Sequence, residues 1–289
     1  THFNSKDMLV FNKKVDLVAH LKAISTQETS IGLVPTMGAL HQGHLSLLKE
    51  SIRNNDITVV SIFVNPTQFN NSEDLLNYPR TQENDIEKIK TVSENIILYA
   101  PTVEDVYEGK TVSQHFDFDG LENQMEGKFR PGHFDGVGTV VKRLFEIVKP
   151  TNAYFGEKDF QQLQIIKKMV SKLNIPVKII GCPILRESNG LAMSSRNERL
   201  SEKDKQFASI IYKTISKAKM QFKTKSASMI SKWVNNQFKN IPDFELEYFQ
   251  IADEATLLPC VRKNKSKQYR AFIAVYINKV RLIDTISLN

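Results

Sequence analysis

Short apolar segments rich in β-branched residues alternate with amphipathic segments over the first two-thirds of the chain. We predict strands at residues 31–35, 57–64, 96–100, 153–155 and 177–181. Between them, apolar stripes at helical spacing comprise Leu45, Leu48 and Ile52; then Val137, Val140, Val141, Leu144, Phe145 and Val148; then Leu163, Ile166, Lys167 and Val170. Apolar strands separated by helices predict an α/β fold, with a parallel sheet covered on both faces.

The pattern changes near residue 186. Residues 186–206 are polar and rich in turn formers, and two helical patterns follow. Ser201 and Asp204 resemble a capping box for the first helix. The inward positions predicted for the two helices are Phe207, Ile210, Ile211 and Ile215, then Ile230, Trp233, Val234 and Phe238. Residues 244–253 and 269–286 are predicted to be antiparallel strands joined by a lysine-rich turn. We therefore predict an N-terminal domain, 1–185, and a smaller α+β domain, 186–289.

Composition narrows the class of protein. The 289 residues are 41% hydrophobic and 25% charged, which is typical of a soluble globular chain. No run of ~18 apolar residues is present, and residues 1–14 lack the apolar core of a signal peptide. Cys182 and Cys260 have neither metal-binding nor redox spacing, so we expect a reduced, cytoplasmic setting. The net charge of +7 permits an anionic partner, but the positive residues are scattered and do not indicate a nucleic-acid surface.

The sequence VPTMGALHQGH, residues 34–44, follows a predicted strand and begins an amphipathic helix. Gly38 permits a tight turn, and Gly43 permits close approach of a ligand to the helix backbone. The free N–H groups and dipole of a helix N-terminus favour an anion, and His41 and His44 add donors for a phosphate. A zinc site would need a third ligand, for which no motif is present. Two surface histidines without a role remain the simpler alternative.

Three further segments strengthen the phosphate interpretation. GEKD, residues 156–159, places a glycine, Lys158 and a helix start after another strand. MSSRN, residues 193–197, offers two hydroxyls and a guanidinium, which suit phosphate oxygens. FVNPTQF, residues 63–69, presents the Gln68 amide at a strand end, where it can both donate and accept hydrogen bonds. Singly, these are also consistent with a surface lysine, a helix-capping linker and an ordinary loop amide. Together they predict a site for a phosphorylated ligand and a second polar substrate.

The chain resembles the pantothenate synthetase (pantoate–β-alanine ligase) family. The motifs that carry the resemblance are PTMGALHQGHLSLL, FVNPTQF, YPRT, RPGHFDGVGTVV, FGEKDFQQL and GLAMSSRN, in the family's order and approximate spacing. HxGH alone occurs across the wider nucleotidyltransferase superfamily, whereas the full set is specific. The resemblance implies a Rossmann-like N-terminal domain, a smaller C-terminal lid domain and a homodimer. It also implies ATP-dependent condensation of pantoate with β-alanine through pantoyl adenylate, releasing AMP and pyrophosphate, with Mg²⁺ accompanying ATP.

The resemblance also assigns residues. His44, His41 and Lys158 are expected to be catalytic. The expected ATP-binding residues are Met37, Gly38, Ala39, Leu40, His41, Gln42, Gly43, His44, Gly156, Glu157, Lys158, Asp159, Leu185, Met193, Ser194, Ser195 and Arg196. Those expected to bind pantoate are Gln68, Gln162, Val137, Val140 and Val141, with Gln68 also near β-alanine. Asn84 stands where relatives are often acidic, so the protein ligand of Mg²⁺ is not predicted. The polar segment 70–79 is expected to be a mobile loop that helps to cover the site.

Two other functions also fit parts of the pattern. A relative of the aminoacyl-tRNA synthetases would share an HxGH-like element and a mobile phosphate loop, and the positive charge suits RNA. About 100 C-terminal residues are a marginal length for an anticodon-reading domain, however. A non-catalytic nucleotide-binding regulator is the other alternative, against which the paired glutamines argue.

Overall fold

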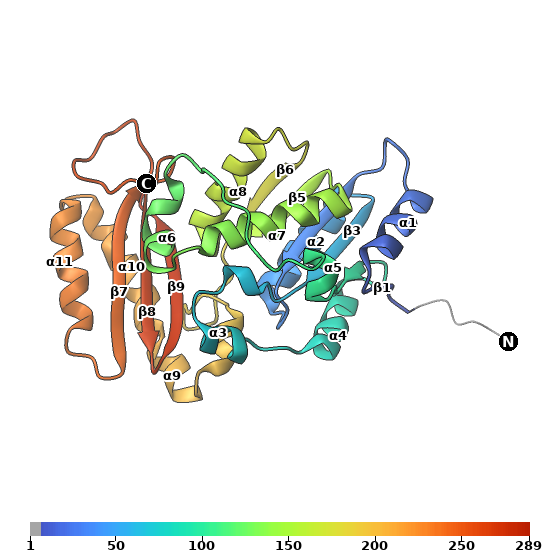
Figure 1. Ribbon diagram of the computed structural model, residues 1–289. Coiled ribbons are helices and arrows are strands. Elements are labelled where there is room, and N and C mark those ends of the chain that lie inside the picture. The colour runs from blue at the N-terminus through green and yellow to red at the C-terminus, as the bar shows by residue number, and fades with distance from the viewer. Residues whose placement is uncertain (1–6) are drawn as a thin grey trace.

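The computed structural model describes residues 7–289, and the first six residues of the segment expected to lack a signal peptide lie outside this range. Two sheets organise the described chain (Figure 1). The larger is a six-stranded parallel sheet made from the N-terminal part, as predicted, and the smaller is a three-stranded antiparallel sheet near the C-terminus. No helix among the described residues is long and apolar enough to cross a bilayer.

The order of the parallel strands creates one reversal. The order across the sheet is β1-β4-β3-β2-β5-β6. The strands are β1 (Val10–Phe11), β2 (Ile31–Thr36), β3 (Ile57–Ile62), β4 (Ile97–Tyr99), β5 (Asn152–Gly156) and β6 (Lys178–Cys182). From β2 the chain first builds outward through β3 and β4, and then returns to add β5 on the other side of β2. Ligands bind at such a reversal, beyond the carboxyl ends of the strands. The segments after β2 and β5 are those predicted to bind phosphate.

Alternating strand residues pack on opposite faces of this sheet. Leu33 and Val59 belong to the apolar core on one face, whereas Val34 and Val60 belong to the core on the other. The first face is covered by α1 (Lys14–Ile24), α5 (Val103–Tyr107), α7 (His133–Val148) and α8 (Phe160–Lys172). The second is covered by α2 (Gln42–Asn54) and α4 (Gln82–Val92). Because both faces are buried, the strands have no polar alternation, which explains why the apolar runs were recognisable.

The C-terminal sheet has its own core. Its strands are β7 (Phe244–Asp253), β8 (Tyr269–Ile277) and β9 (Val280–Ser287), in that order. The predicted segment 269–286 is therefore two strands, joined by a hairpin turn in which Asn278 and Lys279 both have positive φ, 45° and 72°. The helices α10 (Ser209–Phe222) and α11 (Ala227–Phe238) cover one face, and α9 (Glu202–Phe207) precedes them. The domain boundary near residue 186 stays a prediction.

Short helices make the remaining connections around the site. They are η1 (Pro66–Gln68), α3 (Ser72–Asn77), η2 (Leu121–Asn123), α6 (Met125–Phe129), η3 (Glu157–Asp159) and η4 (Ser195–Arg199). The segment 70–79, expected to be a loop, thus contains the helix α3. Three inward positions were predicted wrongly: Ile52 and Phe207 are 38% and 54% exposed, and Lys167 is exposed. On α8 the predicted Leu163 and Ile166 are buried, and Ile165 and Met169 are buried as well, so its inner face is wider than the predicted stripe and excludes Lys167.

Candidate active site

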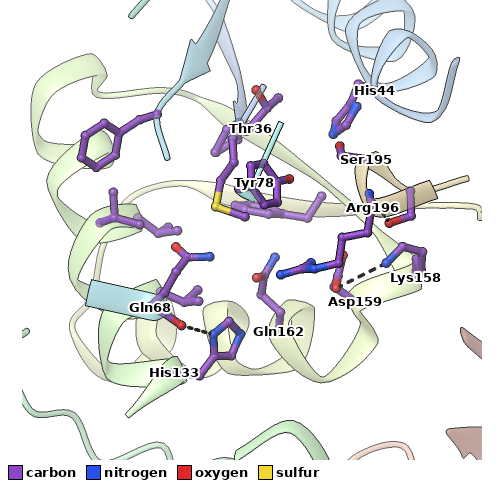
Figure 2. A pocket seen from close by; sticks show the side chains of 18 of the residues that line it. Thr36, His44, Gln68, Tyr78, His133, Lys158, Asp159, Gln162, Ser195 and Arg196 are labelled. Atoms are coloured by element: carbon purple, nitrogen blue, oxygen red, sulfur yellow. Dashed lines mark hydrogen bonds and ion pairs between the residues drawn. The ribbon is translucent and has the colours of Figure 1, made fainter. Parts of the chain in front are cut away.

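A cavity of about 180 Å³ lies where the segments after β2, β3 and β5 meet α7 and η4. Gln68 and His133 lie at one end, His44, Lys158 and Arg196 lie at the other, and Gln162 is between them (Figure 2). The predicted residues that line it are Met37, His41, His44, Gln68, Val137, Val140, Val141, Lys158, Asp159, Gln162, Ser194, Ser195 and Arg196. Segments more than 150 residues apart in sequence therefore converge on one space.

The turn between β2 and α2 is held by a buried carboxylate from another helix. Gly38 and Ala39 have φ of 84° and 49°, a left-handed conformation that glycine adopts without strain. The carboxylate of Asp85, on α4, accepts hydrogen bonds from the N–H groups of Ala39 (3.0 Å) and Leu40 (2.8 Å). The ammonium of Lys88 donates to the Leu40 carbonyl at 2.7 Å. These contacts satisfy backbone groups that the tight turn leaves without partners.

His41 and His44 are oriented by the start of α2. Nδ1 of His41 accepts from the N–H of Gly43 at 3.0 Å, and Nδ1 of His44 accepts from the N–H of His41 at 3.1 Å. A ring nitrogen that accepts carries no proton, so each neutral imidazole bears its proton on Nε2. Burial, followed by the charges of Lys158 and Lys88, lowers the pKa of His41 to about 4. Burial, followed by the charge of His41, holds the pKa of His44 well below its usual value. Both rings are thus neutral hydrogen-bond donors at neutral pH.

At the opposite end, a polar network fixes Gln68. The Asn65 side chain donates to Oε1 of Gln68 and to the Gly136 carbonyl, each at 3.0 Å. His133 contacts the Gln68 carbonyl through Nδ1 at 2.8 Å. A Cβ on Gly136 would lie 2.5 Å from the Gln68 backbone, so only glycine lets α7 approach this closely. With Oε1 occupied, the Gln68 amide has its N–H donors left for a ligand.

The floor of this end is apolar. Val137, Val140 and Val141 are at positions i, i+3 and i+4 of α7, hence on one face, and are at most 7% exposed. Gln162, in the first turn of α8, also lines the cavity, whereas its neighbour Gln161 donates to the Leu121 and Gln124 carbonyls. The two adjacent glutamines therefore have different roles: one faces the cavity and one holds the chain before α6.

The end of the cavity that contains His44, Lys158 and Arg196 is called the phosphate end, after its predicted ligand. Some of its basic and hydroxyl groups already make hydrogen bonds to other parts of the protein. The guanidinium of Arg196 donates to Asp74 of α3 at 2.6 and 3.2 Å, and Arg199 donates to the same carboxylate at 3.1 Å. Burial opposes ionisation of Asp74, but Arg196 outweighs it and keeps the pKa of Asp74 below its usual value. The Ser195 hydroxyl donates to the Ala39 carbonyl at 3.0 Å, which ties η4 to the β2–α2 turn. The ammonium of Lys158 is 3.9 Å from Oδ1 of Asp159, which is a long contact for an ion pair.

Some predicted residues lie outside this cavity. Eight of them are not among the residues that line it: Gly38, Ala39, Leu40, Gln42, Gly43, Gly156, Glu157 and Met193. Leu185 lies in a separate hollow with Ser46, Lys49 and Gly181, at the end of β6 beside α2. The structure thus brings together side chains predicted to bind phosphate and side chains predicted to bind pantoate. Leu185 lies in a neighbouring depression.

Several lining residues had no role assigned from the sequence: Pro35, Thr36, Phe63, Tyr78, Arg130, His133, Leu144 and Phe155. Tyr78, Arg130 and His133 belong to the motifs YPRT and RPGHF. These motifs supported the resemblance to the family, but the sequence assigned no function to the three residues. Phe63, Leu144 and Phe155 look like core residues in the apolar pattern, and only the position of the cavity distinguishes them.

Metal-ligating groups and thiols are the remaining candidates for chemistry. Among residues 7–289, no cluster of three or more His, Cys, Asp or Glu side chains is placed to hold a metal. Asp159 is the carboxylate among the lining residues. Burial raises the pKa of the Cys182 thiol to about 11, so it is protonated at neutral pH and a poor nucleophile.

The chain is similar over nearly its whole length to known proteins. The family model described as pantoate-beta-alanine ligase matches residues 9–287. A pantothenate synthetase of Flavobacterium psychrophilum is 65% identical over 97% of this chain and 100% of its own length. One of Christiangramia forsetii is 54% identical over 98% of this chain and 100% of its own length.

Two solved structures extend the likeness to three dimensions. The pantothenate synthetase of Thermus thermophilus is 37% identical with a TM-score of 0.87, covering 97% of this chain and 99% of that one. The pantoate-beta-alanine ligase of Francisella tularensis, complexed with beta-gamma ATP and beta-alanine, is 35% identical with a TM-score of 0.80. That likeness covers 97% of this chain and 98% of the other. The chain belongs to the pantoate–β-alanine ligase family.

Proposed function

We propose that this cavity condenses pantoate with β-alanine through a pantoyl adenylate, with release of pyrophosphate and then AMP. The chain is a ligase by its family, and the condensation depends on ATP. The observation that carries the proposal is the convergence of two sets of groups in one cavity. Basic and imidazole groups suited to phosphate lie at one end, the Gln68 amide lies at the other, and the Gln162 amide lies between them.

In the first step, a pantoate carboxylate oxygen forms a bond to the α-phosphorus of ATP while the bond to pyrophosphate breaks. A free carboxylate ionises near pH ~4, so the nucleophile needs no general base. Catalysis then depends on placing the two substrates and on stabilising charge at the phosphorus. The Nε2–H groups of His41 and His44 are suited to the α-phosphate oxygens.

The hydrogen bonds of His44 also favour one role over another. A base for the amine of β-alanine would need an unprotonated Nε2 facing the cavity. That tautomer would place an N–H on Nδ1 against the N–H of His41, which now donates to it. His44 is therefore a hydrogen-bond donor to the adenylate, and the β-alanine proton leaves by another route.

The end of the cavity that contains Gln68 and the valines of α7 is called the acid end here. It is suited to pantoate, which has a carboxylate, two hydroxyls and a geminal pair of methyl groups. The N–H groups of Gln68 and the amide of Gln162 match the polar groups, and Val137, Val140 and Val141 match the methyls. This set combines directional polar contacts with apolar contact area, as small-molecule sites usually do.

The β- and γ-phosphates are assigned to Lys158, Ser194 and Arg196, and Arg196 must exchange Asp74 for phosphate when ATP binds. Mg²⁺ usually takes one or two carboxylates together with phosphate oxygens, and the position of Asp159 fits such an ion. When bound, the ion would neutralise charge on the departing pyrophosphate. Leu185, in the neighbouring hollow, is assigned to the adenine.

In the second step the neutral amine of β-alanine attacks the acyl carbon, an amide bond forms, and the bond to AMP breaks. The adenylate must be kept from water between the steps. Segment 70–79 and the C-terminal domain, residues 186–289, are proposed as the cover. Two ion pairs support this: Asp74 with Arg196 joins segment 70–79 to the C-terminal part, and Glu126 of α6 with Arg281 joins that part to the chain beside the cavity. A homodimer and a cytoplasmic location remain expectations from the family.

Exchange of labelled pyrophosphate into ATP tests the proposal. Exchange that requires pantoate but not β-alanine is expected, since adenylate forms before the amine reacts. Pantoate labelled in its carboxylate oxygens should transfer one label to AMP. Label in inorganic phosphate, with ADP as the product, would refute the adenylate. Exchange driven by an amino acid would instead indicate a tRNA synthetase, and absence of any turnover would indicate a regulator.

The same assay tests the acid pocket. Gln162→Ala should weaken the use of pantoate strongly while leaving ATP affinity within a few-fold, because its amide faces the acid end. A pantoate analogue lacking a hydroxyl should be used less well than one lacking a methyl, since one methyl contributes only ~1–3 kcal/mol. Loss of ATP binding with unaltered pantoate saturation would show that the pocket is placed wrongly.

A further inference from the structure

Arg130 is the C-cap residue of α6, and its side chain lines two cavities at once. One is the catalytic cavity. The other, of about 330 Å³, lies between α3 and the β8–β9 hairpin and is also lined by Arg196, Lys279 and Arg281. The Arg130 side chain is 13% exposed, so its guanidinium stands in the wall that separates the two spaces.

The positive charge of Arg130 is poorly compensated. Its contact with a carboxylate is a long one, 3.5 Å from Nη1 to Glu126. Glu126 is already engaged at 2.6 Å by Tyr248 and at 2.5 to 2.6 Å by both terminal nitrogens of Arg281. Burial, together with the charges of Arg196 and Arg281, lowers the pKa of Arg130 although Glu126 and Asp74 oppose this. A buried cation in this position is stabilised when a ligand supplies the missing acceptor.

The other cations have assigned partners. Among residues 7–289, the permanently cationic side chains lining the catalytic cavity are Arg130, Lys158 and Arg196. Under the proposed function, Lys158 and Arg196 bind the phosphates of ATP, and the carboxylate of pantoate must lie beside the α-phosphorus. The carboxylate of β-alanine is the one anionic group of the three substrates that still needs a cation.

We propose that Arg130 binds the carboxylate of β-alanine and thereby directs its amine to the acyl carbon of the adenylate. A guanidinium presents paired donors that match a carboxylate. Arg130 is three residues before His133, whose ring holds the Gln68 carbonyl, so it enters the cavity next to the acid end. The second cavity gives β-alanine an approach to Arg130 while the adenylate fills the first. The inference rests on the proposed function and names the group that selects its second substrate.

Arg130→Gln tests this assignment, with Lys279→Gln as a matched control that removes a positive charge from the second cavity only. In Arg130→Gln, the KM for β-alanine should rise roughly 10- to 100-fold, the range expected for a lost hydrogen-bonded charge pair. Pantoate-dependent pyrophosphate exchange, measured without β-alanine, should stay within about 3-fold of the wild type, because Arg130 has no part in adenylate formation. Lys279→Gln should leave both values unchanged within the same factor.

The uncharged amide of β-alanine provides a second readout that a purely structural role would not move. The wild type should prefer β-alanine strongly over this amide, and Arg130→Gln should lose most of that preference. Arg130→Lys, which keeps the charge and is the milder change for folding, should retain part of it. An unaltered preference in the variants, or a fall in exchange parallel to the fall in overall rate, would overturn the proposal. Absence of exchange in the wild type would instead refute the proposed function itself.

Discussion

The two sides of the phosphate end are held in different ways. On the β2–α2 side, His41 and His44 are locked by backbone N–H groups of the same helix start, and Asp85 closes the turn behind them. On the η4 side, Arg196 is held by Asp74, a carboxylate from α3 that lies 122 residues away in sequence. The first side is complete before any ligand arrives. The second side must change partners to bind phosphate.

This difference separates two tasks. Groups that act on the α-phosphorus gain from fixed geometry, because orientation is achieved before the reaction. Under the proposed function, groups that bind the departing pyrophosphate must also release it, and an internal carboxylate that competes for Arg196 weakens phosphate binding and so favours release. The predictions below test whether the fixed side controls chemistry and the exchanging side controls binding.

The largest effect is expected at the fixed side. His44→Ala should slow adenylate formation by about 10²-fold or more, since it removes a preorganised donor to the transition state. Rapid-quench measurement of the first turnover gives this rate, and circular dichroism checks the fold. The exposed His115→Ala is the control, and it should behave as the wild type. An unchanged first turnover in folded His44→Ala would remove the fixed side from the mechanism.

A pH effect on stability should follow from the same side. The pKa of His41 is about 4 in the folded protein, below its ordinary 6.5, so only the unfolded chain binds this proton between those values. Stability should therefore fall as pH decreases below 6.5, by up to ~1.4 kcal/mol per pH unit for each such histidine. Asp74 has a lowered pKa, so its contribution persists until pH falls below its ordinary 3.8.

Urea unfolding at pH 7.5, 6.5 and 5.5 measures this dependence. His41→Asn should make it less steep by the share of one histidine, because asparagine keeps the capping acceptor of α2 but does not titrate in this range, whereas the buried His44 and His133 still contribute. An equally steep loss in His41→Asn would mean that other groups carry the dependence.

The smallest effect is expected at the exchanging side. Asp74→Asn removes the charge that competes for Arg196, so ATP should bind up to about 5-fold more tightly, or ~1 kcal/mol, as is usual for a partly exposed ion pair. Calorimetric titration with ATP measures the affinity, and the exposed Glu73→Gln on the same helix is the control. Weaker ATP binding in Asp74→Asn would show that Asp74 positions Arg196 for phosphate and does not compete with it.

The sequence predicted the parts of the fold that depend on local pattern. The five principal strands were recognised because both faces of the parallel sheet are buried, so their apolar runs are nearly continuous. The two-residue strand β1 was missed because it is too short to have a period. Phe207 was placed inward because the predicted helix is in fact two, α9 and α10, and a break between helices turns a residue to another face.

The site was predicted only in part for a related reason. The motif around His41 and His44 contains its own hydrogen-bond partners, so its conformation depends on a short segment. The pairing of Asp74 with Arg196 and the exposure of Arg130 to the cavity depend on contacts between distant segments. No spacing in the sequence encodes them. Tertiary packing alone determines them.

The carboxylate of Asp85 has a consequence for the order of folding. It lies 45 residues after Leu40 in the turn whose N–H groups it binds, and it reaches them from α4, which follows β3 along the chain. The left-handed turn at Gly38 and Ala39 therefore has no partner for its N–H groups until α4 docks. The segment 31–54 contains the whole HxGH motif. As a free peptide, however, it should not adopt the conformation of the β2–α2 turn that orients His41 and His44. We therefore expect competence to bind ATP to arise only when this contact of long sequence separation has formed.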